Sequence, residues 1–396
     1  DLTRRNYFTV RHVGRGENSY EYHPLFREFL LKVAEGRYGN RQIDVLRRQA
    51  ASLHEMRGDV EAAAELYCLA KDWESISRVV LAQAPTLLMQ GRARQVLRWI
   101  EAMPGTAIGD SPWLLYWRGV SRFGTDPASS QADLACALAT FENTSDMAGT
   151  YLCLAGLFEA IWYAQTDFTQ LDPLIRKFET LAAAHPEIPS LDIEVRVFSG
   201  LTRAVFYRCP DHPQARAWVE RAVNLWGRIT DPNLRVPLGV SISFQLTWYG
   251  EMQRIATMHE AHEELLRHAA LEPLCKISLL LMGGFIRCFL GDYAGSHRDV
   301  EQGLEIARQE GVHVVDPLLL AVGCYSTLTI GSLAEADAYL DECGRFLAVH
   351  RRDLDISHYQ FLRSWRDMLA GDLPRSHEAA RMALELAQQV GAAYPV

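Results

Sequence analysis

The sequence has no uninterrupted apolar run long enough to cross a membrane. Its best candidate, Ile277 to Ile286, stops after ten residues at Arg287, whereas a transmembrane helix needs about 18–20 apolar residues. The N-terminus also lacks the basic start and apolar stretch of a secretory signal peptide. We therefore expect a cytoplasmic protein that does not contact a membrane.

The cysteines are nowhere paired as CxxC. Such pairs are typical of zinc sites and redox motifs, and evenly spaced cysteines in small secreted proteins form disulfides. The cysteines of this chain are scattered, and we expect them to be reduced, buried and unpaired. They are Cys68, Cys136, Cys153, Cys209, Cys275, Cys288, Cys324 and Cys343.

Positively charged residues are not in excess either. The 396 residues include 40 Lys and Arg against 49 Asp and Glu, a formal net charge of -9, which argues against a nucleic-acid-binding surface. No GxxxxGK[ST] loop is present to hold nucleotide phosphates. With 48% hydrophobic and 22% charged residues, the chain can bury a large core and is not expected to be disordered.

What the sequence does contain is a turn signal that recurs about every forty residues in its C-terminal half. The steps between these turns are 40, 41, 40 and 40 residues, and an apolar segment precedes each turn. Less even steps of 44, 42, 33 and 33 residues connect equivalent turns towards the N-terminus. The turns are Gly58-Asp59, Gly91-Arg92, Gly124-Thr125, Thr166-Asp167, Pro210-Asp211, Gly250-Glu251, Gly291-Asp292, Gly331-Ser332 and Gly371-Asp372.

These intervals predict paired helices, each pair joined by a tight turn. An acidic residue or Ser directly before Pro is typical of an N-cap followed by the first helical position. It occurs at Ser111-Pro112, Asp172-Pro173, Asp231-Pro232 and Asp316-Pro317. Because one helix pair cannot bury its apolar face alone, neighbouring pairs must stack. We predict an all-α fold, a right-handed superhelix of TPR-like helix-turn-helix repeats with a period of about 40 residues; a globular helical bundle is the alternative.

The first forty residues follow a different pattern. Tyr7 to Val13 is rich in β-forming residues, Gly14 to Asn18 is a turn cluster, and Ser19 to Tyr22 can return as a second strand. A helix is expected over Leu25 to Glu35. A lone hairpin is marginal in water, so it must pack on this helix or on residues outside this chain. The chain begins at Asp1 and not at Met, so we expect it to be a segment of a longer protein.

This region carries a family resemblance. The run Tyr22-His23-Pro24-Leu25-Phe26-Arg27-Glu28-Phe29-Leu30 resembles the last helix of the winged-helix module in MalT-type, LuxR-family ATP-dependent transcriptional activators. Similar segments follow in the same order as far as Pro104, and beyond it the resemblance is architectural. These segments are Leu46 to His54, Arg57 to Asp59, Ala62 to Glu65, Ala70 to Glu74, Leu87 to Gly91 and Leu97 to Pro104.

The resemblance implies a domain order. In that family an ATPase domain precedes the winged helix, a helical-repeat sensor follows it, and a DNA-binding helix-turn-helix comes last. Residues 1–40 would then be the C-terminal part of the winged-helix domain and residues 41–396 the TPR-like sensor. No cofactor is expected in this segment, since ATP would bind the absent ATPase domain.

The resemblance also implies partners. The sensor would bind a small-molecule inducer, with a sugar as one candidate, or a regulatory protein, and would act on its own ATPase and helix-turn-helix domains. Arg381 to Val396 contains no basic recognition helix, so no direct DNA contact is expected. Homo-oligomerisation of the full-length protein is left open.

The candidate binding surface is a column of residues on the first helix of each pair. Counted back from the turn, positions eleven, seven and three are spaced by four and so share a helical face. In the first four repeats of this column, which begin at Trp113, the face mixes aromatic, charged and hydroxyl groups, and the concave side of a solenoid is where such proteins bind. The candidate ligand-binding residues are Trp113, Trp117, Glu159, Tyr163, Ser199, Arg203, Tyr207, Ser243 and Thr247. In the alternative interpretation the tryptophans fill the core and Glu159 pairs with Arg203.

Three functions stay open at this point: an inducer sensor, a TPR-like scaffold for a protein or peptide, and an enzyme. No GxSxG elbow or other catalytic motif is present, so no enzymatic activity is expected. The densest group of metal-ligand residues is His259, His262, Glu263 and His268. Because zinc needs three or four converging ligands, a solvated helix face is the simpler interpretation, and no metal is expected.

Overall fold

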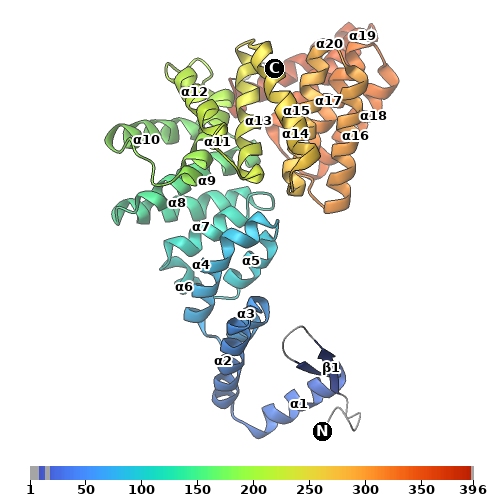
Figure 1. Cartoon of the computed structure of the whole chain (residues 1–396). Helices are drawn as coiled ribbons and strands as arrows, with labels where there is room; N and C mark the ends of the chain where they lie inside the picture. Colours follow the sequence, from blue (N-terminus) through green and yellow to red (C-terminus); the bar gives the residue numbers. More distant parts are fainter. Residues whose placement is uncertain (1–8, 14–17, 394–396) are drawn as a thin grey trace. The chain divides into compact units, whose positions relative to one another are not determined.

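The computed structural model describes residues 9–13 and 18–393, which are built almost entirely of α-helices (Figure 1). This agrees with the predicted all-α repeat architecture. The described part contains twenty α-helices and one short 3-10 helix. Their bounds are α1 Pro24–Arg37, α2 Asn40–Met56, α3 Val60–Leu69, α4 Trp73–Met89, α5 Ala93–Glu101, α6 Gly105–Gly109, α7 Pro112–Ser121, α8 Pro127–Asn143, α9 Met147–Ala164, η1 Phe168–Gln170, α10 Leu171–Ala184, α11 Leu191–Arg208, α12 Ala215–Trp226, α13 Pro232–Trp248, α14 Met252–His268, α15 Pro273–Leu290, α16 Tyr293–Glu310, α17 Asp316–Thr329, α18 Leu333–Val349, α19 Asp353–Leu369 and α20 Leu373–Val390.

Two short strands precede the helices. β1 (Thr9–Val13) pairs antiparallel with β2 (Asn18–Tyr22), so that Thr9 lies opposite Tyr22 and Val13 opposite Asn18. The expected start of the first strand at Tyr7 and most of the turn cluster lie outside the described residues. That these strands belong to a winged-helix domain stays a prediction.

The chain divides into two compact units. One comprises Asp1–Gln83 and Arg98–Ala107, and the other comprises Ala84–Leu97 and Ile108–Val396. The second unit holds all the candidate ligand-binding residues. The expected boundary at residue 40 stays a prediction.

The repeat turns lie where the sequence predicted them. Each of the nine falls between two successive helices. At Gly291 the backbone φ is +83°, a conformation that only Gly adopts without steric cost, and Asp292 then caps α16 by accepting from the Gly295 N–H at 2.9 Å. Each first helix also contacts its equivalent in the next pair, in the series α7, α9, α11, α13, α15, α17 and α19. This regular stacking is typical of a solenoid and not of a globular bundle.

Two of the four predicted N-caps are correct. Ser111 accepts from the Leu114 N–H at 3.4 Å, and Asp231 accepts from the Asn233 N–H at 2.9 Å. At the other two sites the helix begins earlier than predicted, so that Asp172 and Asp316 lie in the first turn. Their carboxylates are bound by other side chains, Asp172 by Arg208 at 2.7 Å and Asp316 by a histidine ring.

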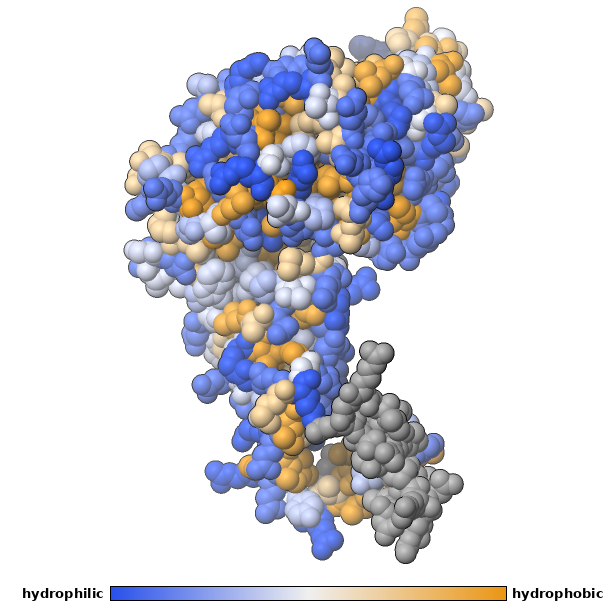
Figure 2. All heavy atoms as spheres, in the orientation of Figure 1, coloured by the Kyte–Doolittle hydropathy of each residue, from blue (hydrophilic) through white to orange (hydrophobic). Residues whose placement is uncertain are grey.

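Two helices in the described part are long and apolar enough to span a membrane by length and composition alone. They are α9 and α15, with 67% and 50% of their residues buried. Both belong to the continuous hydrophobic core that runs from Tyr151 to Val390. On the face shown in Figure 2, apolar residues form separate patches among hydrophilic ones. Burial inside the stack therefore explains the apolar character of both helices, and the cytoplasmic location stays a prediction.

The end of the second unit bonds back to its middle. The Leu354 N–H donates to the Gln165 carbonyl oxygen at 3.1 Å. The guanidinium of Arg208 donates to the Gly391 carbonyl oxygen at 2.8 Å, across 183 positions of sequence. The array from α9 to α20 is therefore closed on itself by contacts between its first and last helices, and no repeat period predicts such contacts.

A buried polar cluster forms the centre of this closure. Arg352 and Asp355 form an ion pair at 2.9 Å, with side chains only 10% and 2% exposed. Gln165 lies between them. With its side-chain amide turned so that both ends are satisfied, its oxygen accepts from Arg352 Nη2 and its nitrogen donates to Asp355 Oδ1, both at 2.9 Å. Arg352 also donates to the Val314 carbonyl oxygen at 2.6 Å. Gln165 adopts a positive φ of 52°, which is unfavourable for a residue other than Gly. The hydrogen bonds of this cluster therefore hold the Gln165 backbone in that conformation.

The cysteines differ from expectation in their burial. All eight are free thiols, as predicted. Cys153, Cys275, Cys324 and Cys343 are buried, three are partly buried, and Cys136 is exposed. The prediction that all of them are buried is therefore wrong for Cys136, which lies on α8, the outer helix of its pair.

Replacing Arg352 by Met should destabilise the second unit by about 3–5 kcal/mol, because a charged Asp355 would be left buried without its partner. The midpoint of chemical denaturation, followed by tryptophan fluorescence, measures the effect. The neighbouring Arg351 provides a matched control, since its side chain is 80% exposed and pairs with Asp353. Arg351→Met should change stability by less than about 0.5 kcal/mol. Equal effects of the two substitutions would contradict the role of the closure.

Thiol labelling of the native protein should modify Cys136 first. Burial raises the pKa of the thiols of Cys153, Cys275, Cys324 and Cys343, and only the thiolate reacts. Brief exposure to N-ethylmaleimide, followed by peptide mass spectrometry, tests the order of reaction. Rapid labelling of any of these four in the folded protein would show that the stacked helices open more readily than their packing indicates.

Candidate functional site

A cavity of about 360 Å³ lies inside the second unit. Its wall is formed by the first helices of successive pairs, α7, α9, α11, α13, α15 and α17, together with the end of α4. These are the helices on which the sequence predicted the candidate binding column. Apolar and aromatic residues make up most of the wall: Pro85, Leu88, Met89, Tyr116, Trp117, Val120, Phe123, Leu152, Ala155, Gly156, Trp162, Tyr163, Val195, Leu234, Pro237, Val240, Phe244, Leu274, Cys275, Leu281, Val315 and Leu318.

The composition of these helices explains how they can both pack and leave a space. Gly156 faces Leu134 of α8 so closely that a Cβ there would lie 3.1 Å from the Leu134 methyl carbons, so a larger residue would force this side chain to shift. Pro237 sits inside α13 and has no N–H for the Asn233 carbonyl oxygen. The Cys275 thiol of α15 replaces that donor at 3.7 Å. Both Pro237 and Cys275 line the cavity.

Five of the nine predicted residues line the cavity: Trp117, Glu159, Tyr163, Ser199 and Arg203. They come from α7, α9 and α11, so the column brings together side chains from three successive repeats. That these five residues bind a ligand stays a prediction.

Four predicted residues lie elsewhere. Trp113 packs edge-on against Phe141, with ring centroids 4.9 Å apart. Tyr207 lines a second, smaller cavity. Ser243 and Thr247 donate to backbone carbonyl oxygens of their own helix at 2.9 and 2.8 Å. A spacing of four advances about 40° beyond a full helical turn, so end positions of the column such as Trp113, Tyr207 and Thr247 rotate away from the cavity. The end positions Tyr163 and Ser199 remain in its wall. In α13 the register is also shifted by one residue, since Phe244 and not Ser243 faces the cavity.

Glu159 and Arg203 form an ion pair within the cavity wall. Arg203 Nη1 lies 2.6 Å from Glu159 Oε2, and the two side chains are 11% and 20% exposed. Arg203 also donates to Ser241 Oγ at 3.2 Å, and its guanidinium lies 4.5 Å from the centre of the Trp162 ring. Glu159 and Arg203 thus form the ion pair that the alternative interpretation predicted, and both also line the cavity. The charges of this pair are satisfied within the protein.

The cavity wall contains a second group of polar residues, Asp231, Asn233 and Glu272, that the predicted column does not include. Asp231 caps α13, and the Asn233 side chain accepts from the Glu272 N–H at 2.9 Å and donates to the Ala270 carbonyl oxygen at 3.2 Å. Asn233 thereby ties the start of α15 to the start of α13. Asp231 and Glu272 each stand directly before a Pro that opens an inner helix. This shared pattern is the feature of the sequence from which the second polar group could have been predicted.

Glu272 is electrostatically unusual. Its carboxylate forms no hydrogen bond or ion pair with the residues that the structure describes, although its backbone N–H is bound. Burial raises the pKa of Glu272 to about 7, the negative charge of Asp231 adds to the increase, and Arg196 opposes it. A carboxyl group that is half ionised near neutral pH, in the wall of an apolar cavity, is a marker of a functional site.

Two further polar atoms in the wall lack partners. Ser199 Oγ and Trp162 Nε1 are buried and form no hydrogen bond with the described part of the chain. Their residues are 5% and 8% exposed. A buried polar group without a partner is costly, and solvent reaches neither atom in this arrangement of the wall.

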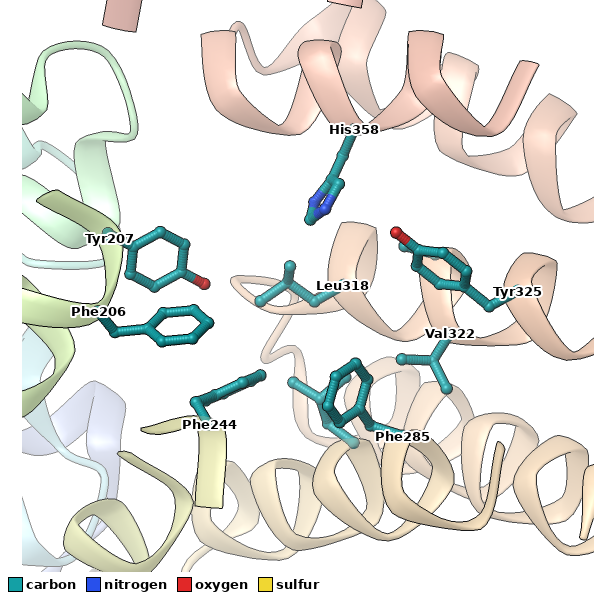
Figure 3. A pocket seen from close by; sticks show the side chains of 10 residues that line it. Phe206, Tyr207, Phe244, Phe285, Leu318, Val322, Tyr325 and His358 are labelled. Atoms are coloured by element: carbon teal, nitrogen blue, oxygen red, sulfur yellow. The ribbon is translucent and has the colours of Figure 1, made fainter. Parts of the chain in front are cut away.

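The second cavity has a volume of about 40 Å³ and an aromatic wall (Figure 3). Phe206 and Tyr207 extend into it from α11, Tyr325 from α17, and His358 points inwards from α19. The Tyr207 carbonyl oxygen accepts from the Ala393 N–H at 2.7 Å, which places this cavity at the closure of the array. Its wall shares Phe244, Leu281 and Leu318 with the larger cavity, so the two spaces are neighbours along the inner surface.

The histidine cluster on α14 is not a solvated face throughout. His262 is 2% exposed, and its ring packs edge-on against Trp226 with centroids 6.0 Å apart. Burial lowers the pKa of His262 to about 3, which keeps the ring neutral. Among the described residues no three His, Cys, Asp or Glu side chains are grouped as metal ligands.

Comparison with known proteins adds no family to this description. No protein-family model matches the chain, and no curated protein matches it.

The pH dependence of stability should report the ionisation of Glu272. Because its pKa in the folded state lies above the ordinary value of 4.5, the folded protein binds this proton more tightly than the unfolded chain does between pH 4.5 and 7. Its contribution to the free energy of unfolding therefore falls as the pH rises through that window. Relative to Glu272→Gln, the wild type should lose about 1–2 kcal/mol between pH 4.5 and pH 8, allowing for solvent screening of a half-buried group.

Denaturation midpoints at several pH values measure this difference. Asp231, Arg196 and Cys275 are the charged or titratable groups that interact with Glu272, and all three are kept in the variant. Glu264→Gln, at an exposed position of α14, should follow the wild-type profile. Identical profiles for the wild type and Glu272→Gln would contradict the raised pKa.

Proposed function

We propose that this chain is the sensing region of a MalT-like, LuxR-family transcriptional regulator and binds a small-molecule effector in the larger cavity. The observation that carries the proposal is this cavity itself. It combines a mainly apolar wall with a few polar groups, at a size within the range of small-molecule sites of about 300–1,000 Å³.

The closure of the array favours a small ligand over a peptide. A TPR-like scaffold binds extended partners along an open concave surface. Here the last helices bond back to the middle of the unit, and the polar groups of the wall lie among aromatic side chains. A protein partner is the alternative that the experiment below distinguishes.

The same geometry supports a sensing role. The cavity wall takes residues from six inner helices, each from a different pair. A ligand that touches several of them stabilises one relative arrangement of the repeats. It can shift the equilibrium between two arrangements only by its difference in affinity for them. We propose that such a shift is passed to the ATPase of the parent protein, where ATP would bind, while this segment acts neither as an enzyme nor on DNA.

A thermal-shift screen of sugars, nucleosides, amino acids and amines should yield a compound that raises Tm. At a hundred times its Kd such a ligand adds about 2.7 kcal/mol to the stability of the folded state. Ser278→Phe should abolish the shift, because Ser278 lines the cavity and is only partly exposed, so that a ring at this position fills the space.

The matched control is Asn224→Phe, which adds the same ring at an exposed position on the outer helix α12. This variant should keep the shift. If no compound stabilises the protein and a protein partner co-purifies with it, the small-molecule proposal fails in favour of a scaffold.

A further inference from the structure

We propose that the effector is an organic cation: a protonated amine that binds at Asp231 and Glu272, attached to an apolar body that fills the rest of the cavity. This inference rests on the proposed function, since it names the chemical class of the ligand for the same cavity. It is carried by the balance of charges in the wall, the unpartnered buried atoms and the composition of the surrounding surface.

The first argument is the charge balance. Five charged side chains line the cavity, and two of them, Glu159 and Arg203, neutralise each other at 2.6 Å. The remaining three are the carboxylates of Asp231 and Glu272 and the guanidinium of Arg196. With both carboxylates ionised this end of the cavity has a net negative charge, so a single positive charge on the ligand restores neutrality.

The competing choice is an anion bound by Arg196. That side chain belongs to an exposed residue on α11 and forms no ion pair with the described residues, so water can solvate its charge. Glu272 is half-buried beside an apolar wall and has no partner for its carboxylate. Because an unpaired charge costs most where water is excluded, Glu272 gains more from a ligand than Arg196 does.

The second argument comes from the buried atoms. Ser199 Oγ and Trp162 Nε1 lie in the same wall, belong to residues more than nine-tenths buried, and have no partner. An indole N–H can only donate. Solvent reaches neither atom in this arrangement of the wall, so a ligand bonds to the indole only if the wall shifts. It must then present an acceptor atom, which an amine with a hydroxyl, ether or carbonyl oxygen in its body provides.

A metal ion fits this wall poorly. Calcium and magnesium require about six oxygen ligands, and no group of three or more His, Cys, Asp or Glu side chains occurs in the described part. Aromatic and aliphatic side chains dominate instead, including Tyr116 and Trp117. An organic cation uses both features, since its charge meets the carboxylates and its carbon skeleton meets the apolar surface.

Three indole compounds of nearly equal size test the charge preference: tryptamine is a cation, indole-3-ethanol is neutral and indole-3-acetate is an anion. Isothermal titration calorimetry at pH 8 keeps Glu272 mostly ionised, because its pKa is about 7. We expect tryptamine to bind at least tenfold more tightly than either of the other two.

Two variants locate the cation. Glu272→Gln should reduce the preference for tryptamine over indole-3-ethanol to threefold or less. Asp231→Asn should also reduce it, and because Asn caps helices as well as Asp does, this variant should keep the start of α13. Glu264→Gln, the exposed control, should leave all three affinities unchanged.

The outcomes separate this inference from the proposed function. Equal binding of all three indoles, lost in Ser278→Phe, would keep the cavity as a ligand site and overturn its preference for a cation. Absence of tryptamine binding at millimolar concentration would also overturn the preference, as would tryptamine binding that Glu272→Gln and Asp231→Asn leave unchanged. The proposed function itself fails only if no compound in the wider screen depends on the cavity.

Discussion

The closure between the start and the end of the helical array is the contact on which the rest of this structure depends. Single helix pairs bury little surface, and stacked pairs alone would leave an inner face open to solvent. Hydrogen bonds from Leu354 to Gln165 and from Arg208 to Gly391 join the two ends. The buried ion pair of Arg352 and Asp355 lies at this junction. Buried ion pairs add little net stability but lose much when one partner is removed, so this junction specifies one arrangement of the array more than it strengthens it.

The inner helices line two hollows near this closure, and both hollows are open in part to solvent. The larger cavity lies among the inner helices of six pairs, and its smaller neighbour lies where the last helices return. Any change in the curvature of the stack must therefore change the shape of the larger cavity. On the proposed function, binding in the cavity and movement at the closure would be coupled in both directions, as linkage requires. The proposed sensing role depends on this coupling.

The sequence predicted the local features well and the long-range ones poorly. Six of the nine repeat turns were predictable because they place a Gly at positive φ, which is a short-range requirement of the backbone after a helix. The pairing of Glu159 with Arg203 followed from matching positions in adjacent repeats. The shift of register at Phe244 did not follow, because it depends on how α13 rotates against its neighbours. The closure at Gln165 was not predictable either, since it results from small rotations added over many repeats, and no single repeat encodes their sum.

A closed array also constrains how such a protein can change in length. An open solenoid tolerates the gain or loss of a repeat, because each repeat contacts only its neighbours and its stability is nearly additive. In this chain an added helix pair between α9 and α19 would carry Arg352 past Gln165 and leave both groups buried without partners. The number of repeats in the second unit is therefore restricted in the way that the number of strands in a closed barrel is. Diversification of ligand binding is consequently expected through substitutions on the inner helices, at a constant repeat number.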